Sequence, residues 1–383
     1  GDEAGRGADL FESVTAENLG GMIIALVLSI VLFKTINEDY VLLPLLVRAV
    51  GVVATLAGIG WAVFQRSFKD AIEPLRNGLI VTSVVAAALM YLISTTVFGS
   101  SYLPMFASMV VGLVAGILIM FYSEIYTGLR SKYVGLIAGN SESGPALTVV
   151  SGLAVGMIST ALPVVTVVVA IAISFVLGTQ WAQMVMLPDP FLGGVFGTTM
   201  ATMGMLSTAG FVLTMDGVGP IVDNAGGIAE MANAPDEIRE RLEPLDALGN
   251  TTKALTKSYA MGSAALAALL LFQAFLLEVA RYQAGIIELA HLTAEQSSKL
   301  LSQIEALSSQ LQINSPSVLI GLFIGAMVPF LFSGYAVNAV ATGAFQMVEE
   351  VRRQFRTIPG LLNGAARPEY GRCVDISTRT ALR

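Results

Sequence analysis

The chain has 383 residues, of which 55% are hydrophobic and only 13% are charged. Soluble domains carry about a quarter charged residues, so this composition excludes an ordinary soluble globule and a disordered chain. The formal net charge of −7 provides no general attraction for a nucleic-acid backbone. A single cysteine and a single histidine exclude an intrachain disulfide, a thiolate metal cage and a multi-histidine metal site. The remaining class is a polytopic helical protein of the lipid bilayer.

Eight apolar segments are long enough to cross a bilayer, which takes about 20 residues. They cover residues 14–34, 41–64, 77–98, 102–123, 146–177, 191–214, 255–280 and 316–345. Apolar runs without strand-like alternation favour helices over a barrel, so we predict an all-α transmembrane bundle in which residues 1–383 form one membrane domain. The segment 146–177 is too long for an upright span, and we expect it to tilt, bend or protrude, with a kink at Pro163.

Basic residues predict the orientation of the bundle. They gather around 124–145, around 215–254 and after residue 346, which we place in the cytoplasm. Lys34 and Arg48 are assigned to span ends on the other side. The segment 281–315 is predicted to be an external, amphipathic connection, and we assign no function to His291 within it.

The first polar stripe is Asp2, Asp9 and Glu12 in GDEAGRGADLFES. On a helix, Asp2 and Asp9 share a face, and the stripe extends about 15 Å from the cytoplasmic surface into the membrane. Ionisable groups in apolar segments suggest function. Outer carboxylates of this stripe can bind cations, and a deeper one can carry a proton. The alternative is a solvated helix start in which Arg6 neutralises a neighbour.

The second stripe is Asp216, Asp223 and Asn224 in MDGVGPIVDNAGGIAEM. Carboxylate and amide oxygens suit a hard cation such as Mg²⁺. We expect Gly219-Pro220 to break the helix and the following glycine pair to let backbone approach a ligand. An acidic loop cap is the alternative.

The third stripe is Asp246, Asn250, Lys253 and Lys257, with spacings of four, three and four. On a helix these residues occupy one face. A carboxylate, an amide and two lysines in line suit a metal–phosphate ligand. A salt-bridge ladder along the helix is the alternative.

The other patterns have structural interpretations. Arg372, Asp375 and Arg379 are expected to pair with one another, and the run 349–356 is expected to be a solvated helix end. The small residues in SGLAVGMISTALP and GTTMATMGMLSTAG predict close helix packing. Neither a P-loop nor a GxSxG elbow occurs, so a nucleotide-driven pump of that design and an α/β-hydrolase have no support.

Five segments together resemble the membrane-bound, ion-pumping inorganic pyrophosphatases: GDEAGRGADLFES, GPIVDNAGGIAEM, LDALGNTTKALTKSYAMGSAAL, EEVRRQF and RCVDIST. The resemblance implies hydrolysis of Mg²⁺-bound pyrophosphate to two phosphates at a cytosolic site, coupled to export of H⁺ or Na⁺. It also implies a homodimer with about sixteen helices per subunit in two concentric rings, of which this chain holds the end of the fifth to the start of the fourteenth.

The resemblance also implies roles for individual residues. Asp2 would activate the attacking water, and Asp9 and Glu12 would form the ion gate. The substrate and metal contacts would be Asp2, Asp223, Asn250 and Lys257, and we add Asp216 and Asp246 to this set. Lys253 would replace a bound K⁺, with Thr256 as its accompanying change, which favours a potassium-independent proton pump.

Departures from the family pattern limit these expectations. Upstream substrate-binding residues and the C-terminal pair of helices are absent, so the chain alone is expected to be inactive. Glu3 and Arg6 replace small or apolar residues, and Glu243-Pro244 puts the cap of the next helix in doubt. We assign the H⁺-pumping function to the intact protein, in a prokaryotic inner membrane with its site toward the cytoplasm. The alternatives are Na⁺ pumping and a secondary transporter with half-helix ion sites.

Overall fold

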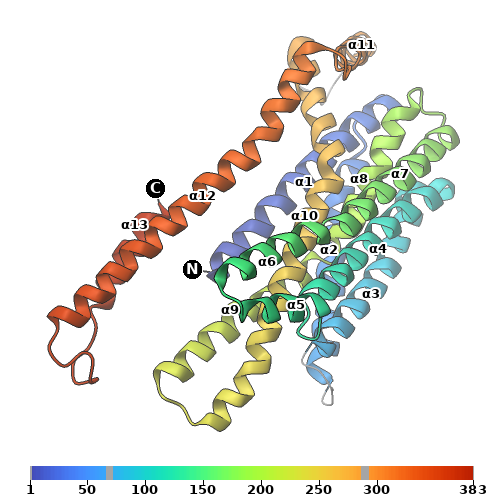
Figure 1. The fold of residues 1–383 in the computed structure, drawn as a ribbon. Coiled ribbons are helices and arrows are strands. Elements are labelled where there is room, and N and C mark those ends of the chain that lie inside the picture. Colours follow the sequence, from blue (N-terminus) through green and yellow to red (C-terminus); the bar gives the residue numbers. More distant parts are fainter. Residues whose placement is uncertain (1, 66–71, 286–292, 383) are drawn as a thin grey trace. The chain divides into compact units, whose positions relative to one another are not determined.

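The computed structural model describes residues 2–65, 72–285 and 293–382, and within them every regular element is a helix (Figure 1). Contacts divide it into unit 1, Gly1–Ile304, and unit 2, Glu305–Arg383. Unit 1 contains α1 (Asp2–Phe33), α2 (Glu38–Phe64), α3 (Glu73–Phe98), η1 (Gly99–Ser101), α4 (Tyr102–Thr127), α5 (Lys132–Ser141), α6 (Pro145–Ser159), α7 (Ala161–Met184), α8 (Pro190–Leu206), α9 (Ala209–Met231) and α10 (Asp236–Gln283). Helix α11 (Ala294–Gln310) crosses the division, and unit 2 contains α12 (Pro316–Thr357) and α13 (Tyr370–Ala381).

The described helices confirm the predicted all-α membrane fold. Among the residues that the structure describes, six helical stretches are long and apolar enough to cross a membrane, or seven if the bent pair α8–α9 counts as one span. The expected number was eight. The difference arises because the 69-residue stretch Glu73–Ser141 contains both α3 and α4, which pack against each other. Each of these two helices has 26 residues, or about 39 Å, which is enough to cross the bilayer alone.

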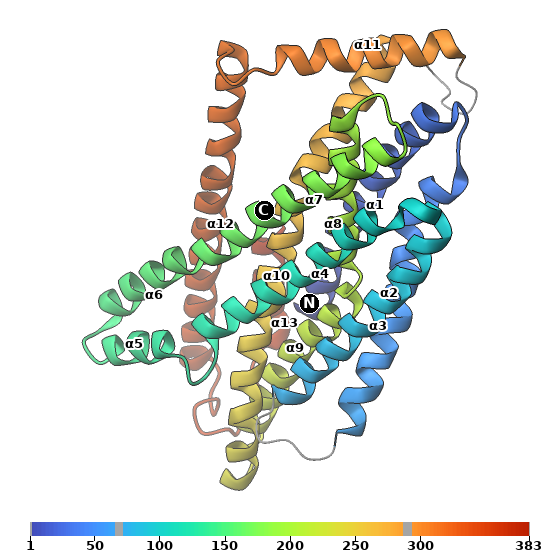
Figure 2. The ribbon, with the colours of Figure 1, turned by 90° about the vertical axis from the view of Figure 1, so that its right-hand side faces the viewer.

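The successive spans of unit 1 alternate in direction (Figure 2). Helices α6 and α7 continue in one direction and form one such stretch, and α8 and α9 form a bent pair. Asn77 at the start of α3 donates to Gln65 at the end of α2, and the Arg76 guanidinium lies 3.6 Å from Glu124 near the end of α4. The ends of α2 and α4 and the start of α3 therefore share one end of the unit. Arg48 does not lie at a span end as predicted, because α2 begins at Glu38 and places it about 15 Å inside the helix.

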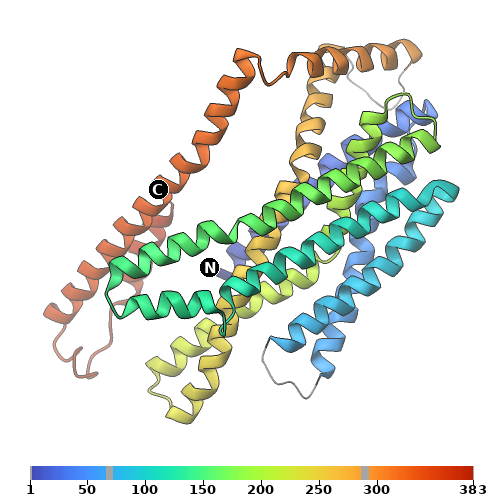
Figure 3. The ribbon, with the colours of Figure 1, turned by 45° about the vertical axis from the view of Figure 1, so that its right-hand side comes forward.

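Helix α8 occupies the centre of unit 1, where α1, α2, α4, α7 and α10 pack around it (Figure 3). Every residue from Gly193 to Leu206 is buried. Glycines permit this packing: a Cβ atom on Gly112 of α4 would overlap the Ala201 carbonyl, and one on Gly204 would overlap the Met109 carbonyl. The close packing predicted from the small residues of GTTMATMGMLSTAG is confirmed.

The helix interruption predicted near Pro163 is present, but the one predicted at Pro220 is not. The long segment 146–177 is interrupted at Thr160, between α6 and α7, because Pro163 has no N–H for the carbonyl of Ser159. The predicted break at Gly219-Pro220 is wrong, since α9 continues through Pro220. The chain instead bends by 43° between α8 and α9. Pro244 also lies inside a helix, the 48-residue α10, so no helix starts after Glu243-Pro244 and the helix cap that this pair put in doubt does not occur there.

Unit 2 consists mainly of α12, a 42-residue helix whose most apolar 18-residue window has no buried residue within this chain. This helix confirms the apolar segment predicted at 316–345. The predicted connection at 281–315 contains amphipathic helix α11, and His291 lies outside the described residues. Membrane sides, and the extent of the domain, stay predictions.

Candidate functional site: a junction of α1, α9 and α10

Three helices bring the predicted polar stripes together near one end of unit 1. Helices α1, α9 and α10 contact one another pairwise. The backbones of α9 and α10 nearly touch, because a Cβ atom on Gly249 would lie 3.1 Å from the Cα of Gly219. Because glycines have no side chains at this crossing, the acidic stripe of α9 and the lysine-containing stripe of α10 face each other at short range.

Asp216 of α9 lies at the centre of this junction and is only 5% exposed. Its Oδ1 accepts from Arg6 Nη1 of α1 at 2.5 Å and from the Thr256 hydroxyl of α10 at 2.7 Å. The Arg6 and Asp216 side chains are 10% and 7% exposed. A buried charge needs an oppositely charged partner and hydrogen bonds. Arg6 of α1 and Thr256 of α10 supply these to Asp216 of α9, so their contacts join all three helices.

Pro220 explains a second contact of Arg6. A proline has no N–H, so the carbonyl four residues earlier, that of Asp216, has no helical donor. Arg6 Nη1 lies 3.5 Å from that carbonyl oxygen. Within membrane spans, prolines are tolerated because donors from neighbouring helices satisfy the carbonyl groups that the proline leaves without a helical partner. Arg6 thus contacts both the side chain and the backbone of Asp216.

The two lysines of α10 face other helices. Lys253 Nζ lies 3.1 Å from Asp223 Oδ2 of α9, and Lys257 Nζ lies 4.0 Å from Asp9 Oδ2 of α1. Both pairs are open to solvent in this chain, with the carboxylates 61% and 56% exposed. The alternative of a ladder along α10 would pair each lysine within its own helix. The described pairs instead cross between helices.

The remaining predicted residues have simpler surroundings. Asn250 is exposed beside the Gly219–Gly249 crossing, Asp246 is half-buried one turn earlier, and Glu12 is exposed. Asp2 begins α1, but its side chain lies outside the described residues. The catalytic, gating and metal-binding roles assigned to these residues stay predictions.

The donor set suits a metal that shares its ligands with a phosphate. In the part of the chain that the structure describes, no group of three or more Asp, Glu, His or Cys side chains could hold a metal ion. Mg²⁺ commonly takes only one or two carboxylates and completes its shell with water and substrate phosphate oxygens. The exposed Asp223 carboxylate and the exposed Asn250 amide, on adjacent helices, fit that pattern.

Sequence reasoning missed a second polar cluster deeper in unit 1. Glu17 of α1 is 1% exposed and occupies the buried seam that also contains Leu10, Ile24 and Val31. These four residues recur every seven positions, and an acidic residue in such a seam was the signal that could have revealed it. Arg48 of α2, assigned to a span end, belongs to the same cluster.

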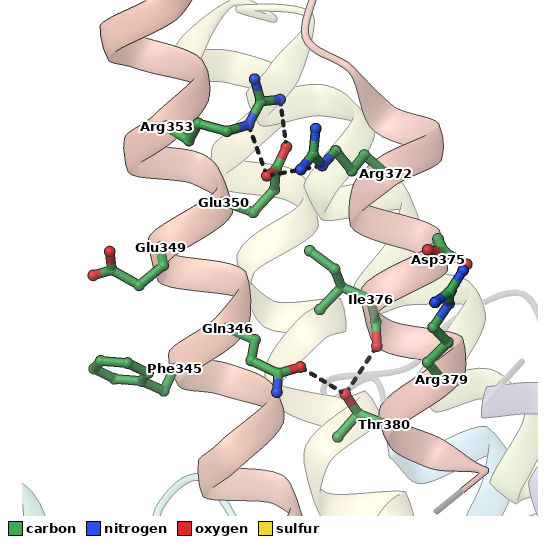
Figure 4. A pocket seen from close by; sticks show the side chains of 10 residues that line it. All are labelled: Phe345, Gln346, Glu349, Glu350, Arg353, Arg372, Asp375, Ile376, Arg379 and Thr380. Atoms are coloured by element: carbon green, nitrogen blue, oxygen red, sulfur yellow. Dashed lines mark hydrogen bonds and ion pairs between the residues drawn. The ribbon is translucent and has the colours of Figure 1, made fainter.

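Unit 2 has its own charged pocket of about 570 Å³, between α12 and α13 (Figure 4). Asp375 pairs with Arg379 at 2.9 Å, as predicted, but Arg372 pairs with Glu350 of α12 at 3.2 Å. Arg353 also contacts Glu350, at 2.7 Å. The expectation of a fully solvated helix end is therefore wrong for Glu350, whose side chain is 5% exposed under two guanidinium groups.

Comparisons with known proteins identify the family of the chain. The family model of the inorganic H⁺ pyrophosphatases matches residues 1–383. The chain is 43% identical to "K(+)-insensitive pyrophosphate-energized proton pump 2" of Moorella thermoacetica, over 100% of this chain and 52% of that protein. It is 42% identical to the "K(+)-insensitive pyrophosphate-energized proton pump" of Caldanaerobacter subterraneus subsp. tengcongensis, over 100% of this chain and 51% of that protein.

A third relative carries a different description. The "Putative K(+)-stimulated pyrophosphate-energized sodium pump" of Clostridium tetani is 41% identical, over 99% of this chain and 50% of that protein. The chain spans about half the length of these curated relatives. The match along its whole length, over helices that join paired carboxylates and lysines, shows that this integral membrane chain belongs to the inorganic H⁺ pyrophosphatase family.

Proposed function

We propose that the complete protein hydrolyses pyrophosphate to two phosphates and uses the reaction to move H⁺ out of the cytosol. The observation that carries this proposal is the junction of α1, α9 and α10. There, Lys253 and Lys257 lie within 4.0 Å of carboxylates on two different helices. A polyanion that attracts the lysines therefore acts directly on the carboxylates that they hold.

The hydrolytic site is proposed to lie at the Gly219–Gly249 crossing, toward the cytoplasm of a prokaryotic inner membrane. Asp223 and Asn250 would hold Mg²⁺ together with pyrophosphate, with Asp246 as a further contact. The bound metal supplies charge neutralisation and Lewis acidity at the phosphoryl oxygens. Lys257 would stabilise the charge on the leaving phosphate, and Asp2 would orient and deprotonate the attacking water.

Coupling follows from competition for Lys257. In this structure its Nζ lies 4.0 Å from Asp9 Oδ2, so Asp9 faces a cation. When an anionic substrate binds Lys257, that cation is shared or withdrawn, and Asp9 would then take up the transported proton. Glu12, one turn further along α1, would receive the proton next. Release of phosphate restores the Lys257–Asp9 contact and completes the cycle.

The central experiment uses membrane vesicles that contain the complete protein. We expect phosphate release on addition of Mg²⁺ and pyrophosphate, together with acidification that a protonophore abolishes and a sodium ionophore does not. Absence of phosphate release would refute the enzymatic proposal and favour a secondary transporter. Transport that persists with protonophore and collapses with sodium ionophore would assign Na⁺, the ion in the description of the Clostridium tetani relative.

Two further proposals follow from the relatives. Lys253 lies against Asp223, where its ammonium group would take the place of a bound K⁺, with Thr256 beside it on α10. We therefore propose potassium independence, in line with the descriptions of two relatives. We also propose a homodimer, which the molar mass of the complete protein in detergent would test.

A further inference from the structure

A buried polar cluster lies at the bend between α8 and α9, apart from the junction described above. Glu17 lies near the middle of α1, about 23 Å from either end. Both of its carboxylate oxygens are buried and have no hydrogen-bond partner among the described residues. Buried polar groups are normally hydrogen-bonded, and an exception calls for an explanation such as water, an ion or a catalytic role.

The polar neighbours of Glu17 donate their hydrogen bonds to other groups. Arg48 of α2 and Ser263 of α10 lie beside it. The Arg48 guanidinium donates to the carbonyl of Leu206 at the end of α8, and the Ser263 hydroxyl donates to the Ala260 carbonyl at 3.0 Å. Among the described residues no basic nitrogen lies within 4.0 Å of the Glu17 carboxylate. Arg48 is therefore close enough to act on the charge of Glu17 without forming a contact pair.

The bend itself creates this environment. The last carbonyls of a helix have no internal donors. At the end of α8, Arg48 supplies one donor, and the Tyr259 hydroxyl of α10 supplies another to Met205 at 2.5 Å. Thr208 lies 3.1 Å from the Tyr259 oxygen. Charged and hydroxyl groups thus surround Glu17 from α2, α10 and the bend, in an otherwise apolar bundle.

A pocket of about 230 Å³ leads toward this cluster. It lies between α1, α2 and the start of α9, is lined by Leu10 and Val14, and reaches Arg48 and Ser207. Its volume exceeds that of several water molecules, and Arg48, Ser207 and the Leu206 carbonyl are polar groups to which water can bind. Water in this pocket would connect the level of Asp9 and Glu12 on α1 with the level of Glu17.

We propose that Glu17 is a further proton-carrying residue, which accepts the transported proton after Glu12 and passes it toward the opposite side, with Arg48 as its positioning partner. Protonation of Glu17 moves a proton to the carboxyl oxygen, and release transfers it to water or the next acceptor, so no other reactant is needed. Because Arg48 is fixed to the α8 carbonyl, motion of α1 changes the separation of the two groups and switches Glu17 between accepting and releasing. This inference rests on the proposed proton pumping.

The test compares three forms of the complete protein in vesicles: wild type, Glu17→Gln and Glu17→Asp. The readout is the number of protons transported per pyrophosphate hydrolysed. We expect Glu17→Gln, which keeps the shape of the side chain, to lower this ratio at least tenfold, and Glu17→Asp to retain part of it. Glu38→Gln, an exposed position at the start of α2, is the matched control and should leave the ratio unchanged. An unaltered ratio in Glu17→Gln would overturn the inference.

A second readout does not depend on transport. Infrared difference spectra on addition of pyrophosphate should contain, within the carbonyl bands of protonated carboxyl groups, one component that is absent in Glu17→Gln and shifted in Glu17→Asp. If Glu17→Gln does not fold, the comparison of wild type with Glu17→Asp decides, and an unshifted band refutes the inference. Failure of wild type to hydrolyse pyrophosphate would instead refute the proposed function, so the two failures are distinguishable.

Discussion

Removal of Arg6 tests the buried ion pair that joins α1 to α9. Arg6→Met leaves the Asp216 carboxylate, which is 5% exposed, with the Thr256 hydroxyl as its described donor. Breaking a buried pair on one side destabilises proteins by about 3–5 kcal/mol. The hydrogen bond from Thr256 to a charged acceptor is retained, so we expect a loss near the lower limit, about 3 kcal/mol. The free energy of unfolding would be measured by SDS titration in mixed micelles.

The double variant Arg6→Met/Asp216→Asn separates charge from packing. It removes both charges and keeps an amide oxygen that can accept from Thr256, so most of the lost stability should return, to within about 1 kcal/mol of wild type. Arg241→Met is the control, because its pair with Glu237 is 78% and 76% exposed and should contribute less than about 0.5 kcal/mol. If Arg6→Met is no more destabilising than this control, or if the double variant is less stable than Arg6→Met, the ion-pair explanation fails.

Four other predictions address the site and the packing. Glu12→Gln should abolish vesicle acidification, and unchanged acidification would rule out its place in the ion gate. Lys253→Ala should make hydrolysis depend on K⁺, which a potassium titration would check; a flat titration would contradict potassium independence through Lys253. Chelation of Mg²⁺ should stop phosphate release and added Mg²⁺ should restore it, whereas persistent release would contradict a metal-bound substrate. Gly112→Ala should destabilise the protein by about 1–3 kcal/mol, since the new methyl overlaps the Ala201 carbonyl, while Gly60→Ala, in open space, should be neutral or stabilising; equal stability of the two variants would contradict the packing argument.

Much of the helical framework was predictable because apolar run length and helix period are local properties of the sequence. The stripes on α1, α9 and α10 were therefore found, and the structure brings them to one junction. The partners were not predictable, because Asp216 could not be matched to Arg6, 210 residues away, without the tertiary fold. Local rules also failed at Pro220, where the predicted break ignored the donor that another helix provides. Glu17 went unnoticed because a single charge forms no polar stripe, and its signal was only its place in the apolar seven-residue series of Leu10, Ile24 and Val31.

The glycine contacts of α8 have a mechanical consequence. At Gly112 and Gly204 the backbones of α4 and α8 touch, and at Gly178 and Gly197 those of α7 and α8 do, so these three helices cannot separate or tilt without losing dense contact. They form a stator. Under the proposed function, a movement that links pyrophosphate hydrolysis to ion release would therefore be carried by α1, α9 and α10, the helices that hold the lysines and carboxylates. Tight packing of α4, α7 and α8 thus favours movement of the helices that carry the charged residues.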